Sequence, residues 1–508
     1  MSTWSRHPVI YEINTWVWLS SIASRIGRPI HLSSVPTTEW DAIATFGFEA
    51  VWLMGVWERS PASREIANHN QMLLDDFRRA LADFRPEDNV GSAYSVRRYT
   101  VDSALGGAEG LATAREELAR RGMRLILDFV PNHVAPDHPW VVEHPEYFVL
   151  GSREDARDDP GSFLQTEGRV FARGRDPYFP AWPEVLQLNA FDAGMRDASI
   201  QTVLAIAEQC DGIRCDMAML LLNAIFERTW GQRAGRRPDT EYWTELIPVA
   251  RQRHPDFLLM AEAYWDHEWE LQQLGFDYCY DKRLYERLEH GDAESVRLHL
   301  SAEPTYQSKL VRFIENHDEP RAASAFSGAK EEAAALTAAT IPGARLFHEG
   351  QFEGRRIRPA VFLRRRPDEH PDEARHSFYE TLLEAIDDPL FHNGEWRLCP
   401  CTGWHDNPSF QNLVAWCWEH GEDRAIIIVN LSGAPAQGRV HFPWDDLGKT
   451  TWHLHDCLSR SHEIYIRDGL ELDQQGLYVD LEAWRGHLFR CSREAAPADA
   501  AAAFVSLA

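Results

Sequence analysis

Short apolar runs alternate with amphipathic helical patterns through the first three quarters of this 508-residue chain. A short, mostly apolar run is typical of a parallel strand covered on both faces. Eight such runs therefore predict parallel strands joined by crossover helices, an α/β fold of the closed (β/α)8 TIM-barrel type. The predicted strands span residues 9–13, 50–54, 124–130, 212–216, 257–262, 276–280, 310–315 and 345–348.

Two further regions interrupt or follow this alternation. Residues 131–194, after the third strand, are too many for a bare loop and predict an inserted subdomain. Short alternating strands over residues 391–492 predict a C-terminal antiparallel β-sandwich domain. The barrel then takes residues 1–130 and 195–390, and the alanine-rich residues 493–508 are predicted to be a disordered tail.

The inserted subdomain is rich in aromatic residues. Most of these rings are expected to form its own core, and a minority to form a wall on which sugars stack. The rings are Trp140, Tyr147, Phe148, Phe163, Phe171, Tyr178, Phe179 and Trp182.

Charge and composition narrow the partners and the compartment. The formal net charge of -26 disfavours nucleic acid and anionic membrane surfaces as partners. No apolar run approaches the roughly 20 residues of a membrane-spanning helix, and residues 1–7 do not resemble a secretion signal. The eight cysteines lack zinc-type spacing and are expected to be buried thiols. We therefore predict a cytoplasmic protein, with its oligomeric state left open.

Acidic and basic residues gather where four of the predicted strands end. The segments are residues 128–133 (DFVPNH), 212–216 (GIRCD), 260–263 (MAEA) and 313–318 (FIENHD). Because working residues of a parallel barrel lie at the carboxyl ends of its strands, these segments are expected to form one site.

Three carboxylates in these segments fit cleavage of a sugar acetal. Retaining cleavage needs an ionised nucleophile and a protonated acid roughly 5 to 5.5 Å apart. Asp216 fits the nucleophile, because Arg214 lies on the same strand face and would hold it ionised. Glu262 fits the acid, because its apolar neighbours favour the neutral form. Asp318 is a third acid that would stabilise the positively charged transition state.

His133 and His317 each follow an asparagine in these segments. Two histidines beside one cluster of acids favour a pair that hydrogen-bonds sugar hydroxyls. A zinc site is the competing hypothesis, but the close histidine pair that such sites favour is missing.

As a set, the four segments resemble the characteristic regions of the alpha-amylase superfamily of retaining α-glycoside hydrolases and transglycosylases. The resemblance covers roughly residues 8–490 and includes the inserted subdomain and the C-terminal sheets. It implies Asp216 as nucleophile, Glu262 as general acid and base, and Asp318 as transition-state stabiliser.

The resemblance also implies the residues that bind the attacked glucose. Tyr94 resembles the tyrosine on which this sugar stacks in the family. Arg214, His133 and His317 would line the same subsite, with Asp128 supporting them.

The chain departs from starch-hydrolysing amylases at several positions. Met219 and Leu220 stand where those enzymes often have lysine and histidine, and Gln187 stands where an acid is common. Asn132 remains as a single candidate calcium ligand. We therefore expect no metal site and no cofactor, and these changes argue against bound calcium.

Arginines are concentrated after the eighth strand. Two interpretations stay open: a solvated basic face that pairs with acidic side chains, or a site for a sugar phosphate or inorganic phosphate, which barrels often hold in this region. The residues are Arg355, Arg356, Arg358, Arg364, Arg365 and Arg366.

The sequence thus predicts a retaining glycoside hydrolase that acts on the α-glucosidic bonds of short gluco-oligosaccharides or α-glucosides. Hydrolysis and transfer share one covalent intermediate, so the motifs do not separate them. The alternatives are an α-glucanotransferase, a sugar phosphorylase or an isomerase on the same scaffold, or a catalytically idle carbohydrate-binding barrel.

Overall fold

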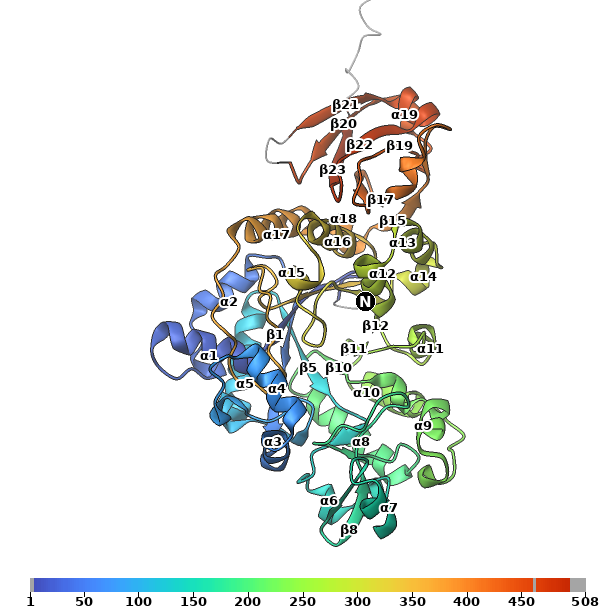
Figure 1. Ribbon diagram of the computed structural model, residues 1–508. Coiled ribbons are helices and arrows are strands. Elements are labelled where there is room, and N and C mark those ends of the chain that lie inside the picture. Colours follow the sequence, from blue (N-terminus) through green and yellow to red (C-terminus); the bar gives the residue numbers. More distant parts are fainter. Residues whose placement is uncertain (1–3, 460–462, 494–508) are drawn as a thin grey trace, which may run out of the picture. The chain divides into compact units, whose positions relative to one another are not determined.

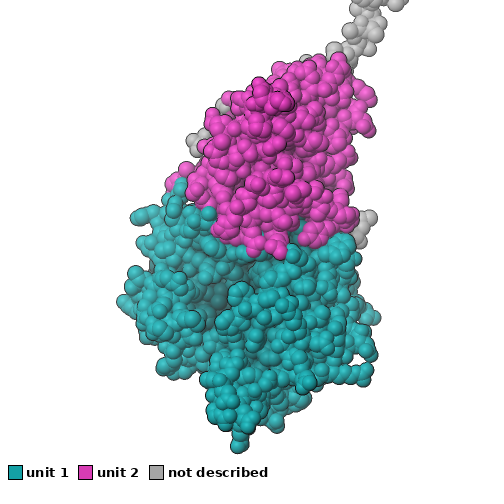
Figure 2. Space-filling model, turned by 45° about the vertical axis from the view of Figure 1, so that its right-hand side comes forward, with its two compact units in different colours: residues 1–282, 308–325, 343–372 teal, residues 283–307, 326–342, 373–508 magenta. Residues whose placement is uncertain are grey.

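The computed structural model describes residues 4–459 and 463–493. The chain divides into two compact units, which Figure 2 distinguishes by colour. Unit 1 holds residues 1–282, 308–325 and 343–372, and unit 2 holds residues 283–307, 326–342 and 373–508. The domain boundaries given above stay a prediction.

Unit 1 contains the predicted barrel. Eight strands close in the order β1-β14-β13-β12-β11-β10-β5-β2 with parallel neighbours, which confirms the predicted fold class (Figure 1). They are β1 (Val9–Asn14), β2 (Ala50–Met54), β5 (Arg124–Phe129), β10 (Gly212–Cys215), β11 (Leu258–Ala261), β12 (Tyr278–Tyr280), β13 (Leu310–Arg312) and β14 (Ala344–His348).

The barrel strands are mostly apolar because both of their faces are buried. All residues of β2 and β11 are buried, as expected for strands enclosed on two sides. Strand β13 ends at Arg312, so the following polar segment lies in a loop. The helices of unit 1 between the strands include α1 (Thr15–Ile26), α2 (Thr37–Ala44), α5 (Gly107–Arg120), α8 (Ala193–Ala207), α9 (Asn223–Trp230), α10 (Tyr242–Arg253) and α11 (Glu268–Gln273).

The inserted subdomain is built from two small antiparallel pairs. Strand β6 (His133–Val134) pairs with β9 (Leu186–Gln187), so its first and last segments lie side by side. Strand β7 (Phe163–Thr166) pairs with β8 (Arg169–Ala172). Helices α6 (Trp140–Glu143) and α7 (Arg153–Asp158) complete it.

A second insertion follows β2 and packs on the segment after β14. Helices α3 (Pro61–Asn68) and α4 (Gln71–Ala80) lie between β3 (Trp57–Arg59) and β4 (Val96–Val101). Phe77 of α4 shares an apolar cluster with Phe362 and Leu363. This packing fixes the segment after β14, part of which reaches the candidate site.

Unit 2 carries the C-terminal antiparallel sheets. One sheet has the order β15-β17-β18-β23-β20-β21 and the other β16-β19-β22, and they share one apolar core, which confirms the predicted antiparallel region. Residues 494–508 of the predicted tail lie outside the described residues. The strands are β15 (Glu395–Cys399), β16 (Cys401–Thr402), β17 (Leu413–His420), β18 (Asp423–Asn430), β19 (Ala436–Val440), β20 (Thr451–Asp456), β21 (Ile464–Asp468), β22 (Leu477–Leu481) and β23 (Gly486–Arg493).

The longer helices of unit 2 include α13 (Ala293–Leu300), α16 (Ala329–Thr340) and α17 (Glu373–Ile386). The indole nitrogens of Trp416 and Trp418 on β17 both donate to the Thr340 carbonyl at the end of α16. Across the described residues, no helix combines the length and apolar character needed to cross a membrane.

Candidate active site

Strand β10 positions the central cation of the site. Ile213 and Cys215 alternate with Arg214 along this strand, and all three are fully buried. The register places Arg214 beside Asp128 of β5 on one side and Met260 of β11 on the other. The guanidinium also lies close to the ring of Trp52, 5.4 Å from its centroid.

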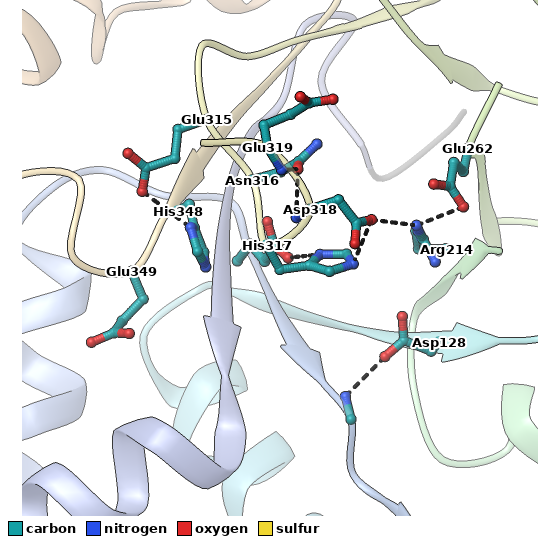
Figure 3. A network of polar contacts seen from close by, with 12 residues as sticks. Asp128, Arg214, Glu262, Glu315, Asn316, His317, Asp318, Glu319, His348 and Glu349 are labelled. Atoms are coloured by element: carbon teal, nitrogen blue, oxygen red, sulfur yellow. Dashed lines mark hydrogen bonds and ion pairs between the residues drawn. The ribbon is translucent and has the colours of Figure 1, made fainter. Parts of the chain in front are cut away.

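One guanidinium contacts all three predicted catalytic acids. Arg214 Nη1 donates to Asp216 Oδ1 at 2.7 Å. Arg214 Nη2 lies 2.8 Å from Glu262 Oε2 and 3.9 Å from Asp318 Oδ2. Figure 3 shows the Arg214 head between the latter two carboxylates. Acids from three distant segments therefore meet at one buried positive charge.

Glu262 is held by two further donors and keeps a proton near neutral pH. The Met217 amide donates to Oε2 at 2.6 Å, and the Tyr264 hydroxyl donates to Oε1 at 2.8 Å. Burial is the main cause that raises the pKa of Glu262, to about 7; the nearby carboxylates raise it further and Arg214 opposes the rise.

The pKa values of the two aspartates shift in opposite directions. Burial raises the pKa of Asp216 above its ordinary value, while the charge and hydrogen bond of Arg214 limit the rise. Burial also acts to raise the pKa of Asp318, but the adjacent His317 outweighs it and holds this pKa well below the usual range. The Asp318 side chain is 40% exposed, whereas that of Asp216 is buried. Asp318 is therefore the most accessible of the three acids.

His317 lies between the carboxylates of Glu12 and Asp318 and stays positively charged. Its Nδ1 pairs with Glu12 of β1, and its Nε2 lies 2.9 Å from Asp318 Oδ2 and 2.7 Å from the Tyr94 hydroxyl. Burial alone would lower the pKa of His317, but Asp318 and Glu12 together raise it to about 10. The Tyr94 ring also stacks on the imidazole, with centroids 5.2 Å apart.

Glu12 was missed by the sequence reasoning. It is fully buried within the otherwise apolar strand VIYEIN. A glutamate is rarely buried unless it is paired, so its place in an apolar strand was a usable signal.

Asp128 and His133 complete the predicted set. The Gly55 amide donates to Asp128 Oδ2 at 2.9 Å, and burial raises the pKa of this acid. His133 is buried, which lowers its pKa to about 3, so the imidazole is neutral. The centroid of its ring lies 5.1 Å from the centroid of the Trp182 ring.

A cavity of about 320 Å³ opens onto the three predicted catalytic acids. Arg214, Asp128 and His317 are buried and are not among the residues that line this cavity. Their contacts with a bound sugar, which the family resemblance implies, stay a prediction. The lining residues are Ser92, Tyr94, His133, Trp182, Glu184, Val185, Asp216, Met217, Glu262, Tyr264, Asp318, Val361 and Phe362.

Glu184 is a fourth acid in this cavity that the sequence reasoning did not single out. Its backbone carbonyl accepts from the Ser95 hydroxyl at 2.8 Å. Burial raises the pKa of its side chain to about 7. The sequence around Glu184 contains no recognisable motif. Glu184 reaches the cavity only because the end of the inserted subdomain folds back onto the barrel.

The residues considered for calcium do not fit that cation. Gln187 Nε2 donates to Asn132 Oδ1 at 2.8 Å, to the Asn132 carbonyl at 2.9 Å and to the Leu188 carbonyl at 3.0 Å. An amide N–H thus occupies the oxygen cluster that a cation would need, while calcium is held by several oxygen ligands. Met219 and Leu220 are buried apolar residues whose side chains supply no ligand.

Three of the six arginines after β14 make polar contacts within unit 1. Arg365 pairs with Asp88 at 2.7 Å and with Asp83 at 3.0 Å. Arg366 pairs with Glu349, and Arg358 Nη1 donates to the Asp318 carbonyl at 2.7 Å. These contacts favour the interpretation of a basic face paired with acids, and the phosphate site stays a prediction.

Comparisons with known proteins relate this chain to one family. A model of the alpha-amylase catalytic domain matches residues 37–357. The alpha-amylase MalA of Haloarcula japonica is 26% identical over 446 residues, which are 85% of this chain and 56% of that protein. An alpha-glucosidase of Culex pipiens is 27% identical over 306 residues, which are 51% of this chain and 45% of that protein.

The chain thus spans about half the length of these two curated relatives. Among solved structures, the noncanonic maltogenic alpha-amylase AmyB of Thermotoga neapolitana superposes with a TM-score of 0.67 at 17% identity. The match covers 96% of this chain and 99% of that one, and it shows a shared fold.

Proposed function

This chain belongs to the alpha-amylase family, and from that premise we propose that it cleaves α-glucosidic bonds of short gluco-oligosaccharides or α-glucosides by double displacement. The observation that carries the proposal is the contact of the buried Arg214 with Asp216, Glu262 and Asp318 at the wall of one cavity. A nucleophile, a proton donor and a charge stabiliser are the three groups that this reaction needs.

In the first step, a carboxylate oxygen of Asp216 attacks the anomeric carbon. The bond to the leaving oxygen breaks, and Glu262 gives its proton to that oxygen. The raised pKa of Glu262, about 7, keeps this proton available near neutral pH. The sugar is left ester-linked to Asp216.

In the second step, the Glu262 carboxylate takes a proton from water or from a sugar hydroxyl. The resulting oxygen nucleophile attacks the anomeric carbon, and the ester to Asp216 breaks. Two inversions restore the α configuration, and both side chains return to their starting states.

Asp318 and the charged His317 would act on the transition state. The low pKa of Asp318 keeps it anionic, so it can stabilise positive charge that develops on the sugar ring. His317 fixes the orientation of Asp318 through the 2.9 Å contact of Nε2 with Oδ2. Tyr94 and the neutral His133 would contact the attacked sugar, while Asp128 and Arg214 support the site from behind.

Transfer to a second sugar is the alternative outcome of the second step. It uses the same covalent intermediate, so the acceptor decides between the two reactions. Phosphorolysis, isomerisation and an idle binding barrel are the other outcomes, and the cytoplasmic location likewise stays a prediction.

Product analysis tests the proposal. Maltose, isomaltose and trehalose would be incubated with the protein, with and without phosphate, and the products followed by chromatography and proton NMR. We expect glucose or transfer products that first appear as the α-anomer, without dependence on phosphate. A β-anomer formed first contradicts the double displacement, and formation of a glucosyl phosphate identifies a phosphorylase instead.

Trapping tests the nucleophile separately. A fluorinated glucosyl fluoride that forms the ester but is slow to lose it would be mixed with the protein, followed by proteolysis and mass spectrometry. The adduct is expected on the peptide that contains Asp216. An adduct on another residue would overturn the assignment.

A further inference from the structure

The loop that carries Asp318 is held at both its backbone amides and its backbone carbonyls. Asn316 Oδ1 accepts from the amides of Asp318 and Glu319, both at 2.9 Å. Arg358 Nη1 donates to the Asp318 carbonyl at 2.7 Å and lies 3.4 Å from the His317 carbonyl. The Asn316 contacts are local, whereas Arg358 comes from the segment after β14.

Asp318 depends on such contacts more than the other two proposed catalytic acids do. Asp216 directly follows β10 and Glu262 directly follows β11, so the strand ladder fixes their backbone. Strand β13 ends at Arg312, and Asp318 lies further along, in a loop. The Asp318 side chain is 40% exposed, against 8% for Asp216 and 4% for Glu262. Its position is therefore set by the contacts of the loop rather than by dense packing.

Arg358 extends from a backbone that is itself anchored. Pro359 follows it, and a proline restricts the backbone of its own residue and of the residue before it. The Val361 carbonyl accepts from the buried Arg59 at 3.2 Å, and Phe362 is buried in the apolar cluster with α4. The guanidinium is thus a support on the loop that originates from a fixed part of unit 1.

The segment that carries Arg358 is part of the wall of the active site. Val361 and Phe362 line the cavity that opens onto Asp318. Arg358 is half-buried and is not among the lining residues, and its contacts reach the site through the backbone of Asp318. It therefore fits the role of a positioning residue rather than that of a substrate contact.

The charge of Arg358 acts in the same direction as its hydrogen bond. Burial acts to raise the pKa of Asp318, but nearby cations outweigh it. His317 has the largest of these effects, and Arg358 also lowers this pKa. The guanidinium therefore favours the anionic form of Asp318, which the proposed transition state needs.

We propose that Arg358 is a positioning residue that holds the backbone of Asp318, and with it the carboxylate, where positive charge develops in the transition state. The inference rests on the proposed function and deepens it. A displacement of about 1 Å in a catalytic group can lower turnover about 100-fold. Arg358 can thus set the rate without touching the substrate.

Arg358→Met tests the contact, because it removes the charge and the donor and keeps a side chain of similar length. We expect kcat on nitrophenyl α-glucoside to fall about 10- to 100-fold, with KM within about 2-fold, because the contact serves the transition state rather than substrate binding. Arg358→Lys keeps a charged donor and should recover part of the loss. Thermal unfolding checks that both variants are folded.

Arg356→Met is the matched control. The exposed Arg356 belongs to the same segment, and its backbone amide donates to Glu369 Oε1 at 2.8 Å. This variant removes the same charge but leaves the Asp318 loop in contact with Arg358, so kcat should stay within about 2-fold. Equal losses in Arg356→Met and Arg358→Met, or no loss in Arg358→Met, would overturn the proposal.

A double-mutant cycle tests whether Arg358 acts through Asp318. In an Asp318→Asn background, Arg358→Met should lower kcat by no more than about 2-fold, because the carboxylate that it positions is gone. A loss as large as the one in the wild-type background would mean that Arg358 acts independently of Asp318. That result would also overturn the proposal.

Hydrogen exchange separates the positioning contact from the reaction. In Arg358→Met, the peptide of residues 313–321 should exchange its amide hydrogens about 5-fold faster or more, since the loop loses a support, whereas Arg356→Met should leave this exchange unchanged. If the wild-type protein does not cleave α-glucosides but the exchange rises in Arg358→Met, the proposed reaction is wrong and the positioning contact stands. Unchanged exchange in Arg358→Met refutes the contact whatever the reaction is.

Discussion

Two clusters of buried charge lie at the carboxyl ends of the barrel strands, and they use the same residue types. One surrounds Arg214 and contains the three proposed catalytic acids. The other surrounds Arg321, which pairs with Glu315 and lies beside His348. Figure 3 shows acids of both clusters, with Glu315 and His348 on one side and Glu262 and Asp318 on the other. The first cluster faces the cavity described above.

The clusters differ in the number of buried acids for each arginine. In the Arg321 cluster, Glu315 pairs with Arg321 and Glu349 pairs with Arg366. Burial acts to raise the pKa of both glutamates, but the arginines outweigh it and lower both values. In the Arg214 cluster, one arginine serves two deeply buried acids, and the pKa values of Asp216 and Glu262 both rise.

The contrast shows that burial alone does not prepare an acid for proton transfer. Both clusters are buried, but only an excess of acid over cation leaves a carboxyl group protonated near neutral pH. The Arg321 cluster is therefore expected to contribute to stability and the Arg214 cluster to chemistry.

Asp216→Asn should have the largest effect on function. The variant keeps the shape of the side chain but removes the nucleophile, so we expect kcat on a reactive gluco-oligosaccharide to fall on the order of 10⁴-fold or more. Initial rates measure this loss, and circular dichroism should show an unchanged fold. Retention of more than a few per cent of the rate would mean that Asp216 does not form the ester.

Glu315→Gln should act on stability instead. It leaves the buried Arg321 without its carboxylate partner, and breaking a buried pair costs about 3–5 kcal/mol in the free energy of unfolding. Urea denaturation measures this change, while kcat per folded molecule should stay within about 2-fold.

The pH dependence of this loss has a fixed sign. The pKa of Glu315 is lower in the folded protein than in the unfolded chain, so its contribution is present above the unfolded value and is lost on acidification. The difference between wild type and Glu315→Gln should therefore shrink as the pH falls. A stable Glu315→Gln variant with impaired turnover would remove the distinction between the clusters.

Much of the barrel and of the acid cluster follows from local sequence. Strands buried on both faces are mostly apolar, so runs such as residues 124–130 can be recognised without any long-range information. Because parallel strands end on one face, Asp216 and Glu262 could be expected to meet.

The side chains that pair with these residues could not be predicted from the local sequence. Glu315 and Asp318 belong to one segment, but they join different clusters because their neighbours come from β14 and β10. Tyr178 and Phe171 are both aromatic residues of the inserted subdomain, but Tyr178 is exposed and Phe171 is buried. Which ring packs inward depends on the path of the whole subdomain, and no periodic pattern encodes it.

Glu262→Gln should stabilise the protein at the expense of its activity. The pKa of Glu262 is raised to about 7 in the folded protein, so its contribution to stability is present below the unfolded value and is lost as the pH rises through about 7. Gln carries no charge, and we expect a gain of about 1–2 kcal/mol in the free energy of unfolding at pH 8. Denaturant titrations at pH 5 should show little gain, because the acid is then protonated in the fold. A loss of stability at pH 8 would contradict the idea that the ionised Glu262 destabilises the fold because it exceeds the available positive charge.

Tyr264→Phe should have the smallest effect, a shift in pH dependence. The Tyr264 hydroxyl donates to Glu262 Oε1 at 2.8 Å and so favours the ionised form of the acid. In the wild type, kcat/KM should fall as the pH rises through about 7, where Glu262 loses its proton. Removing the donor raises the pKa of Glu262, so this decline should move up by about half a pH unit.

Tyr99→Phe is the matched control for that shift. The Tyr99 hydroxyl contacts the Val130 backbone rather than Glu262, so the alkaline decline should stay in place even if the rate changes. A shift of equal size in both variants would mean that general repacking, rather than the hydrogen bond of Tyr264, sets the decline. A downward shift in Tyr264→Phe alone would mean that the hydroxyl favours the protonated acid. In that case the excess of acids over arginines would not by itself account for the raised pKa of Glu262.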